Sequence, residues 1–199
     1  MELYLVRHAQ SAFNRWHHMK WLKPWEWFVK DPFIWDAKLT EKGIQQTIKA
    51  RQEYADIIKR TELIICSPLS RTIMTMQGVF AEAKCPVILT PLIAEKVHHS
   101  CDIGLPLKEL KEKYTNYQFC HFEEELWWYH KGEDPKGIII EPWENVKHRA
   151  DKIKEFLKTR DEKVIAMVSH GNFIRSFMDE VIMFRNCQIK KVEGFGKAQ

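Results

Sequence analysis

The sequence lacks the features that mark several common classes of protein. Its apolar runs are far too short to span a membrane, and the opening "MELYLVRHAQ" has no basic segment ahead of an apolar one, so we expect neither a membrane span nor a signal peptide. The five cysteines form no CxxC pair, and an odd number fits poorly with a closed disulfide framework. We therefore expect reduced thiols and a cytoplasmic location.

The sequence also lacks a large excess of positive or negative charge. The formal net charge is only +4, and the Lys and Arg residues are dispersed among acids rather than gathered in a basic stripe. Nucleic-acid binding is therefore not expected. The 199 residues, of which 45% are apolar and 29% charged, fit a globular protein, and we expect residues 1–199 to form a single domain.

Four short apolar runs predict buried strands at residues 3–6, 63–66, 86–89 and 164–168. Between them, helical spacing predicts helices over residues 40–59, 68–83, 141–159 and 172–183. This alternation is typical of an α/β domain with a mostly parallel sheet. In such sheets, ligands bind beyond the carboxyl ends of the strands.

Polar side chains follow each of these runs. Arg7 and His8 follow the first, Arg71 the second, Glu95 the third and His170 the fourth. Each of them alone is more often structural than catalytic. Together they predict one site with two imidazoles, two guanidiniums and a carboxylate, which could bind an oxyanion and move a proton.

The predicted ligand is a phosphate. Arg supplies planar, bidentate donors for it, and the helix start at "HGNF" would add backbone N–H groups, with Gly171 allowing close approach. We find no HxxxH or DxD pattern, so the sequence predicts no metal site and no cofactor, and protein cations would neutralise the phosphate.

Four segments resemble the histidine phosphatase superfamily, the phosphoglycerate-mutase-like enzymes. "LVRHAQSAFN" resembles the opening Arg-His motif, with Asn14 six residues past the histidine, and "LTEKGIQQ" resembles the Leu-Thr-x-x-Gly-x-x-Gln segment. "SPLSRT" resembles the Ser-x-Leu-x-Arg segment, and "VSHGNFIR" resembles the second-histidine motif. The resemblance implies a three-layer α/β/α fold with a mostly parallel central sheet.

The resemblance also implies roles for these residues. His8 would be the nucleophile that becomes a phosphohistidine, and Glu95 would protonate the leaving oxygen and then deprotonate water. Crowding by the cations should lower the pKa of His8 and keep its attacking nitrogen neutral. The groups expected to bind the phosphoryl group or the substrate are Arg7, Arg71, His170, Asn14, Gln10, Ser67, Gly171 and Asn172.

The chain departs from the family pattern at two places. Ala9 and Gln10 stand where Gly-Glu is commonest, which we interpret as a subgroup feature. Glu82 and Asp102 lie near Glu95 in sequence and remain alternative acids.

The predicted function is metal-independent hydrolysis of a phosphomonoester, on a small phosphorylated substrate or a phosphoprotein. The stretch "EKVHHSCDIG" lacks the Arg-His-Tyr-Gly of true mutases, which favours a phosphatase over a mutase-type phosphotransferase. A non-catalytic phosphate-binding module of the same fold is a further alternative, since fold alone does not establish activity.

Residues 15–35 hold five of the eight tryptophans. Trp21, Trp25 and Phe28 are spaced as one helical face, with Pro24 tolerable only near a helix start, so we expect a helical insert. Three interpretations are open: rings packed on the domain, a wall of the substrate pocket, and, least favoured, a membrane-surface helix. An aromatic wall would suit a substrate with an apolar or planar part.

Overall fold

A six-stranded sheet forms the centre of the part of the chain that the computed structural model describes, which is residues 1–23, 25, 27–131, 138–193 and 195. The strand order is β4-β3-β2-β5-β1-β6, and only β6 runs antiparallel to its neighbour. The strands are β1 (Glu2–Arg7), β2 (Leu63–Cys66), β3 (Val87–Leu89), β4 (Gln118–Phe119), β5 (Val164–Ser169) and β6 (Ile189–Lys191). The four strands predicted from the apolar runs are confirmed.

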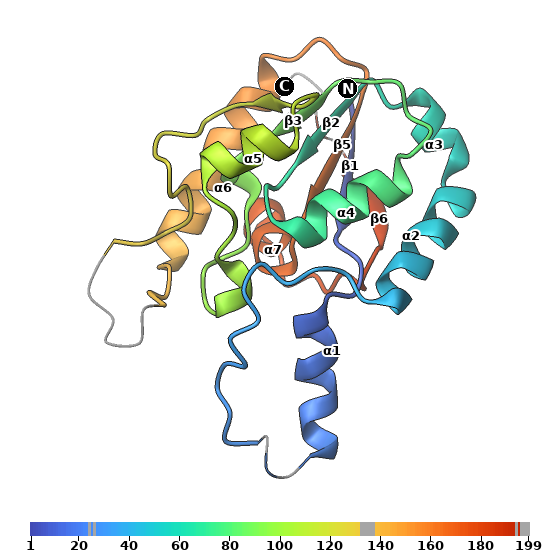
Figure 1. Cartoon of the computed structure of the whole chain (residues 1–199). Coiled ribbons are helices and arrows are strands. Elements are labelled where there is room, and N and C mark those ends of the chain that lie inside the picture. Colours follow the sequence, from blue (N-terminus) through green and yellow to red (C-terminus); the bar gives the residue numbers. More distant parts are fainter. Residues whose placement is uncertain (24, 26, 132–137, 194, 196–199) are drawn as a thin grey trace.

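Helices cover both faces of the sheet, which confirms the three-layer arrangement (Figure 1). On one face, Tyr4 and Val6 pack with α2 (Glu41–Glu53), α3 (Ala55–Arg60), α4 (Ser70–Val79) and α5 (Leu107–Lys113). On the other face, Leu3 and Leu5 pack with α6 (Trp143–Lys158) and α7 (Gly171–Met178). Successive strand residues point to opposite faces, so both faces bury apolar side chains and the strands read as continuous apolar runs.

The predicted helix boundaries needed correction in three places. The helix expected over 40–59 is broken at Tyr54 into α2 and α3. The helix expected over 68–83 is shorter at both ends, and the one expected over 172–183 ends at Met178, where Asp179 adopts a left-handed conformation with φ of 53°. A left-handed residue is a common helix C-terminus, and Asp tolerates it better than most residues.

Residues 12–38 form an arm that projects from the carboxyl-end side of the sheet (Figure 1). It begins with α1 (Ala12–Met19), which Ser11 and Asn14 cap reciprocally, and continues through the short 3-10 helix η1 (Lys20–Leu22). At its base, Phe13 packs with Ala37 and Cys101.

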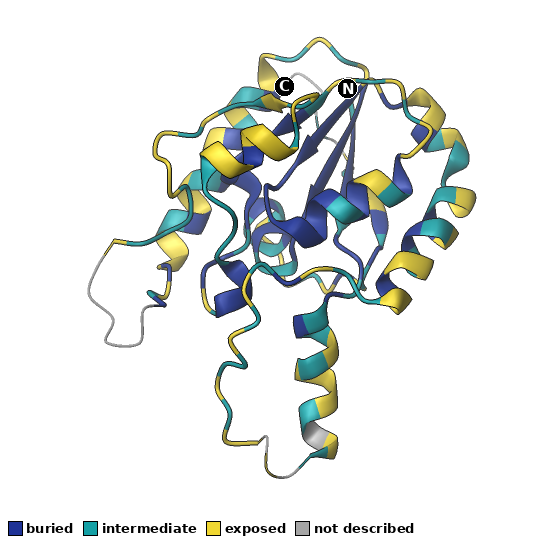
Figure 2. Cartoon of the chain, viewed as in Figure 1, coloured by how far each residue is buried: buried dark blue, intermediate teal, exposed yellow. Residues whose placement is uncertain are grey.

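The single helical face expected for Trp21, Trp25 and Phe28 is wrong, because regular α-helix ends at Met19. Packing of the rings on the domain is also wrong for most of the insert: Trp25, Trp27, Phe28, Phe33 and Trp35 are exposed (Figure 2). Pro24 and the side chain of Trp21 lie outside the described residues. Among the helices of the described residues, none is long and apolar enough to cross a membrane.

Candidate active site

The two candidate histidines lie side by side because their strands are paired in register. Arg7 of β1 pairs with Ser169 of β5, and the backbone N–H of His8 donates to the carbonyl oxygen of Ser169 over 3.0 Å. His8 and His170 therefore leave the sheet at the same level, and their ring centroids lie 5.1 Å apart. Both side chains are buried.

The protonation of His8 is set by its surroundings. Its Nδ1 lies 2.8 Å from the carbonyl oxygen of Ala9, which can only accept, so Nδ1 holds the proton and Nε2 keeps a lone pair. Burial lowers the pKa of His8 well below its usual range, and the charges of Arg71 and Arg7 lower it further. The predicted direction is confirmed, although burial contributes more than the like charges do.

His170 forms the second side of the site. Its Nε2 lies 2.8 Å from the hydroxyl oxygen of Ser67, which is itself buried, so Ser67 orients the ring. Its Nδ1 is buried and has no hydrogen-bond partner. Burial, followed by the charge of Arg71, lowers the pKa of His170 well below its usual range. A buried ring nitrogen without a partner is costly, and an incoming anion with a hydroxyl or oxygen would satisfy it.

Arg7 lies across the start of α7. A Cβ built on Gly171 would be 3.5 Å from the Arg7 Nε and 3.6 Å from its Cζ, so the two groups are neighbours. One guanidinium nitrogen of Arg7 donates to the carbonyl oxygen of Phe184, whereas the buried Nε has no partner. The Arg7 guanidinium therefore lies beside the first residue of α7, and phosphate binding there stays a prediction.

Arg71 is fixed by a buried ion pair. Its Nη2 donates to Asp102 Oδ1 over 2.8 Å, and its Nη1 donates to the carbonyl oxygen of Cys101. The other oxygen of Asp102 accepts from the backbone N–H groups of His98 and His99, at 3.1 Å each. Asp102 thus holds Arg71 beside the two histidines. The positive charge of Arg71 lowers the pKa values of His8 and His170.

Glu95 follows the short 3-10 helix η3 (Pro91–Ile93) at the end of β3. Its Oε1 accepts from the Lys96 N–H over 2.9 Å and its Oε2 from the Asn172 N–H over 3.4 Å, so the carboxyl group lies at the start of α7. Burial raises the pKa of Glu95, the charge of Asp102 raises it further, and the charge of Arg71 opposes both.

The two alternative acids are placed differently. Glu82 is exposed in the turn between α4 and β3, at the amino end of β3 and hence at the edge of the sheet opposite the histidines. Asp102 is buried in the ion pair with Arg71. Glu95 is the one of these three carboxyl groups that accepts a hydrogen bond from the start of α7.

Asn14 and Gln10 lie around the cluster with their side-chain oxygens occupied. Asn14 Oδ1 accepts from the Ser11 N–H and from Asn186 Nδ2, and the same Asn186 nitrogen donates to the carbonyl oxygen of His8 over 3.1 Å. Gln10 Oε1 accepts from the Thr40 hydroxyl over 2.8 Å at the start of α2. Substrate binding by Gln10 stays a prediction.

An ion pair that the sequence reasoning missed holds the segment around Glu95. Arg149 Nη1 donates to the carbonyl oxygens of Leu92 and Ala94, each over 2.9 Å. Its Nε and Nη2 donate to the two carboxylate oxygens of Glu141, over 3.0 and 2.9 Å. Glu141 in turn accepts from the Val97 N–H, so the pair fixes the backbone on both sides of Glu95.

A signal for Arg149 was present in the sequence. It lies on α6 between Val146 and Ile153, at three and four residues from them, which puts a guanidinium on the apolar face of the helix. A charge on such a face has to be paired when it is buried.

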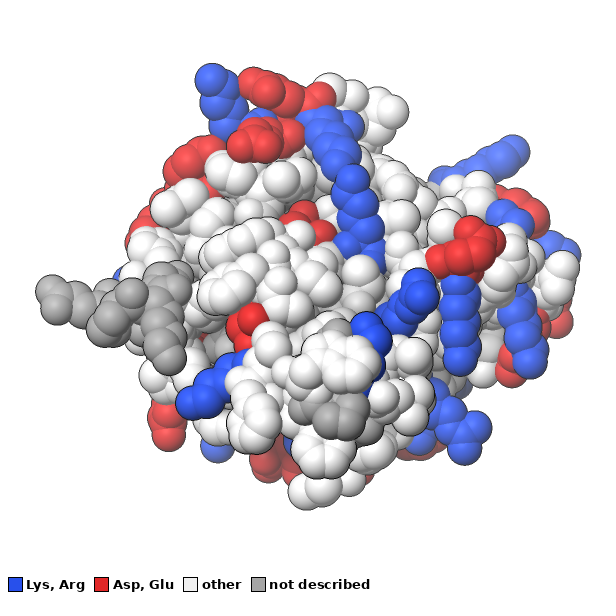
Figure 3. All heavy atoms as spheres, turned by 60° about the horizontal axis from the view of Figure 1, so that its bottom comes forward, with Lys and Arg blue, Asp and Glu red and all other residues white. Residues whose placement is uncertain are grey.

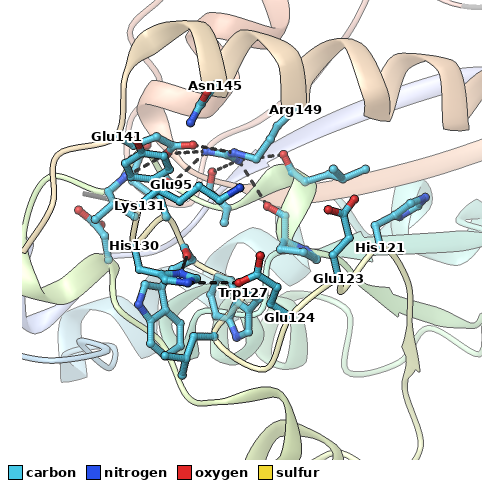
Figure 4. Close-up of a pocket in the computed structure, with 18 of the residues that line it drawn as sticks. Glu95, His121, Glu123, Glu124, Trp127, His130, Lys131, Glu141, Asn145 and Arg149 are labelled. Atoms are coloured by element: carbon cyan, nitrogen blue, oxygen red, sulfur yellow. Dashed lines mark hydrogen bonds and ion pairs between the residues drawn. The ribbon is translucent and has the colours of Figure 1, made fainter. Parts of the chain in front are cut away.

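A cavity of about 350 Å³ opens beside Glu95 (Figure 4). Its wall includes the aromatic cluster of residues 127–129, and Trp127 is fixed by donating its ring N–H to the carbonyl oxygen of Leu105. Charged and polar side chains complete the lining, among them His121, Glu123, His130, Lys131, Asn145 and Lys152. None of the described residues of the 15–35 insert lines this cavity, and the aromatic side chains that do line it include those of the second tryptophan cluster.

The described residues contain no group of three or more His, Cys, Asp or Glu side chains arranged to hold a metal ion. The charges of Arg7 and Arg71 act on both histidines, and that of Arg149 acts on His170.

The fold and the site together define an α/β protein with two buried histidines and two arginines gathered at the carboxyl ends of adjacent parallel strands. The chain belongs to the histidine phosphatase superfamily (branch 1), whose family model matches residues 3–195. The resemblance on which the sequence analysis relied is thereby confirmed.

Two curated relatives show similar levels of identity. Phosphoglycerate mutase-like protein 1 of Arabidopsis thaliana is 27% identical over 207 residues, covering 86% of this chain and 68% of the relative. A protein of Schizosaccharomyces pombe named as a probable phosphatase is 27% identical over 153 residues, covering 71% of this chain and 66% of the relative. The chain thus spans about two thirds of the length of both.

Solved structures share the fold at low sequence identity. The product of an open reading frame of Mycobacterium tuberculosis superposes with a TM-score of 0.61 at 22% identity, covering 98% of this chain and 93% of the other. The phosphoserine phosphatase of Entamoeba histolytica, solved with 3-phosphoglyceric acid, gives a TM-score of 0.55 at 21% identity, covering 96% and 89%. At these identities the likeness supports the fold.

Proposed function

We propose that this protein is a metal-independent phosphatase that hydrolyses a phosphomonoester through a phosphohistidine on His8. The observation that carries the proposal is that two of the three buried side-chain nitrogens without a hydrogen-bond partner among the described residues, His170 Nδ1 and Arg7 Nε, belong to residues next to a neutral His8; the third is Arg175 Nε. A phosphoryl group bound among these residues would satisfy both nitrogens and lie next to the nucleophile.

In the first step, Nε2 of His8 attacks phosphorus and forms the N–P bond as the bond from phosphorus to the leaving oxygen breaks. Glu95 gives its proton to that oxygen, so the leaving group departs as an alcohol. The raised pKa of Glu95 favours the protonated form that this step requires.

In the second step, Glu95, now a carboxylate, takes a proton from water while the water oxygen attacks phosphorus. The N–P bond breaks, phosphate leaves, and His8 and Glu95 return to their starting forms. Arg7 and Arg71 bind the non-bridging oxygens in both steps and stabilise the charge that develops there. Asn14 is oriented to offer its NH₂ group, because its oxygen already accepts from Ser11 and Asn186.

The leaving group would occupy the cavity beside Glu95, since Glu95 has to reach the departing oxygen. Trp127, Trp128 and Tyr129 make one wall of that cavity, which suits a substrate with a planar or apolar part. The name of the fission yeast relative is in keeping with hydrolysis. The names of the plant relatives make mutase activity the alternative to test.

The experiment is a phosphatase screen in the presence of a metal chelator, on the wild type, on His8→Ala and on the exposed control His18→Ala. We expect release of phosphate by the wild type and the control, no release by His8→Ala, and acid-labile labelling of the wild type by a radioactive phosphomonoester. Activity in His8→Ala, or a requirement for a divalent metal, would contradict the mechanism. Primer-dependent isomerisation of phosphoglycerate faster than phosphate release would identify a mutase.

A further inference from the structure

The arm formed by residues 12–38 ends in a cluster of exposed apolar side chains. We call this cluster the aromatic tip, and define it by Leu22, Trp25, Trp27, Phe28, Phe33 and Trp35. Phe28 is 89% exposed, Trp25 74% and Leu22 70%. Soluble proteins rarely expose so many large apolar side chains together, and such patches mark interaction surfaces.

The tip is exposed although the arm is firmly attached to the domain. Asp31 accepts hydrogen bonds from the N–H and the hydroxyl of Ser100, and Asp36 accepts the same pair of bonds from Ser70. Ser11 also bridges to Leu39, which joins the two ends of the arm. The rings are therefore exposed on a segment whose backbone is held to the domain by hydrogen bonds.

Charge is segregated on the arm. Its two described acids, Asp31 and Asp36, are those that face inward and bind serines of the domain. Its basic side chains include Arg15 and Lys30, which are exposed, and Lys20, which lies 5.2 Å from the centre of the Trp16 ring. The outward surface of the described residues is therefore aromatic and basic.

Figure 3 looks at this end of the molecule, and uncharged atoms occupy much of the middle of the face, with Lys and Arg and also some Asp and Glu side chains around them. Trp and Phe partition to the interface of a lipid bilayer, and Lys and Arg are attracted by anionic headgroups. A projecting, convex tip fits a bilayer, which needs no complementary pocket. A protein partner would instead favour a flat face or a groove.

We propose that the aromatic tip inserts into the interface of an anionic lipid bilayer. A membrane-surface role ranked last from the sequence alone, and the exposure of the rings reverses that order. The carboxyl ends of β1 and β5 point toward the arm (Figure 1), so docking would turn the histidine site toward the bilayer. If the proposed function holds, the site would then meet phosphomonoesters carried at the membrane surface.

Co-sedimentation of the full chain with vesicles tests the proposal. The vesicles are made of phosphatidylcholine alone or of phosphatidylcholine with phosphatidylserine. We expect binding to the second kind only, weakened by salt, with a blue shift of tryptophan fluorescence. The double variant Trp25→Ser/Phe28→Ser should bind at least about tenfold more weakly, because it loses two large inserting side chains.

Charge is tested by a matched pair of double variants. Arg15→Gln/Lys30→Gln should weaken binding about fivefold for each charge removed, whereas Lys108→Gln/Lys111→Gln, on α5 away from the arm, should bind as the wild type does. All four positions are exposed, so melting temperatures should be unchanged. His8→Ala should also bind vesicles normally, which separates this proposal from the proposed function.

Three results would overturn the proposal. They are a wild type that sediments with neither kind of vesicle, vesicle binding that the tip variant retains, and equal losses in the two charge variants. A wild-type dimer that the tip variant converts to a monomer, without vesicle binding, would assign the tip to contact with a second copy of this chain.

Discussion

Replacement of Glu95 by Gln separates proton transfer from every other task of this side chain. A carboxamide oxygen can still accept from the Lys96 and Asn172 N–H groups, so the segment should keep its place. The variant loses the proton that Glu95, with its raised pKa, is expected to give to the leaving oxygen. The carboxamide is neutral, as the protonated Glu95 of the first step is, so phosphate binding should not weaken.

The expected size of the loss follows from the role. General acid catalysis contributes about 10²- to 10⁴-fold, or about 3–5 kcal/mol of transition-state free energy. An alkyl phosphate should show the whole loss in kcat, with KM unchanged or lower. p-Nitrophenyl phosphate needs no proton on its leaving oxygen, so its first step should proceed at nearly the wild-type rate.

The assay is rapid-mixing kinetics with p-nitrophenyl phosphate, followed by steady-state kinetics with an alkyl phosphate. Because the carboxamide of the variant cannot deprotonate water, E95Q should release one equivalent of nitrophenolate in a burst and then turn over slowly as the phosphoenzyme accumulates. Asp102→Asn is the control for the competing carboxylate. Equal losses on both substrates, absence of a burst, or a leaving-group dependence that appears in Asp102→Asn instead would refute the assignment.

Four further outcomes are expected. The kcat/KM for an alkyl phosphate should fall as pH rises through the raised pKa of Glu95, and also as pH falls through the lowered pKa of His8. Asp102→Asn should move the upper limb of this profile to lower pH, because the charge of Asp102 raises the pKa of Glu95. In thermal melts, the contribution of His8 to stability should be fully present above pH ~6.5 and should decline as pH falls below it, because the unfolded chain then binds a proton that buried His8 does not. His8→Asn should make the melting temperature less dependent on pH in this range. Arg149→Met should lower the free energy of unfolding by about 3–5 kcal/mol in urea titrations, since it leaves Glu141 buried without its cation, whereas Arg149→Met combined with Glu141→Met should cost less. Trp128→Ala should raise KM for an aromatic phosphate about threefold to tenfold and leave KM for glycerol phosphate unchanged, and an equal change for both would contradict the aromatic wall.

The sheet and its polar edge could be predicted because they rest on local signals. Each buried parallel strand is a short apolar run in the sequence. Because the strands are parallel, the residues at their carboxyl ends lie at the same edge of the sheet. His8 and His170 needed no further information than the ends of β1 and β5. The edge strands β4 and β6 contain one apolar residue each and are only partly buried, so they give no such signal.

The supports of the site are non-local and could not be predicted in the same way. Asn186 reaches His8 across 178 positions of the sequence, and Arg149 reaches Leu92 across 57. Helical spacing places Arg149 on the buried side of α6, but the carbonyl oxygens to which it donates are determined by how α6 packs on η3. Polar pairs of this kind depend on tertiary structure, and the hydrophobic periodicity of the sequence does not reveal them.

The two tryptophan clusters show why composition alone misassigned the pocket wall. Both are rich in aromatic rings and both lie near the site in sequence or in space, yet only the cluster at 127–129 lines the cavity. The difference lies in what each backbone is attached to. Residues 124–130 are tied to the domain by Trp127, which donates to Leu105, and by Glu125, which accepts from the N–H groups of Leu107 and Lys108, and their rings line the cavity beside Glu95. The arm is held by hydrogen bonds of Asp31 and Asp36 to Ser100 and Ser70, and most of its described rings are nevertheless exposed. In our two proposals, the cluster at 127–129 recognises the leaving group and the aromatic tip recognises the bilayer surface at which the substrate is presented.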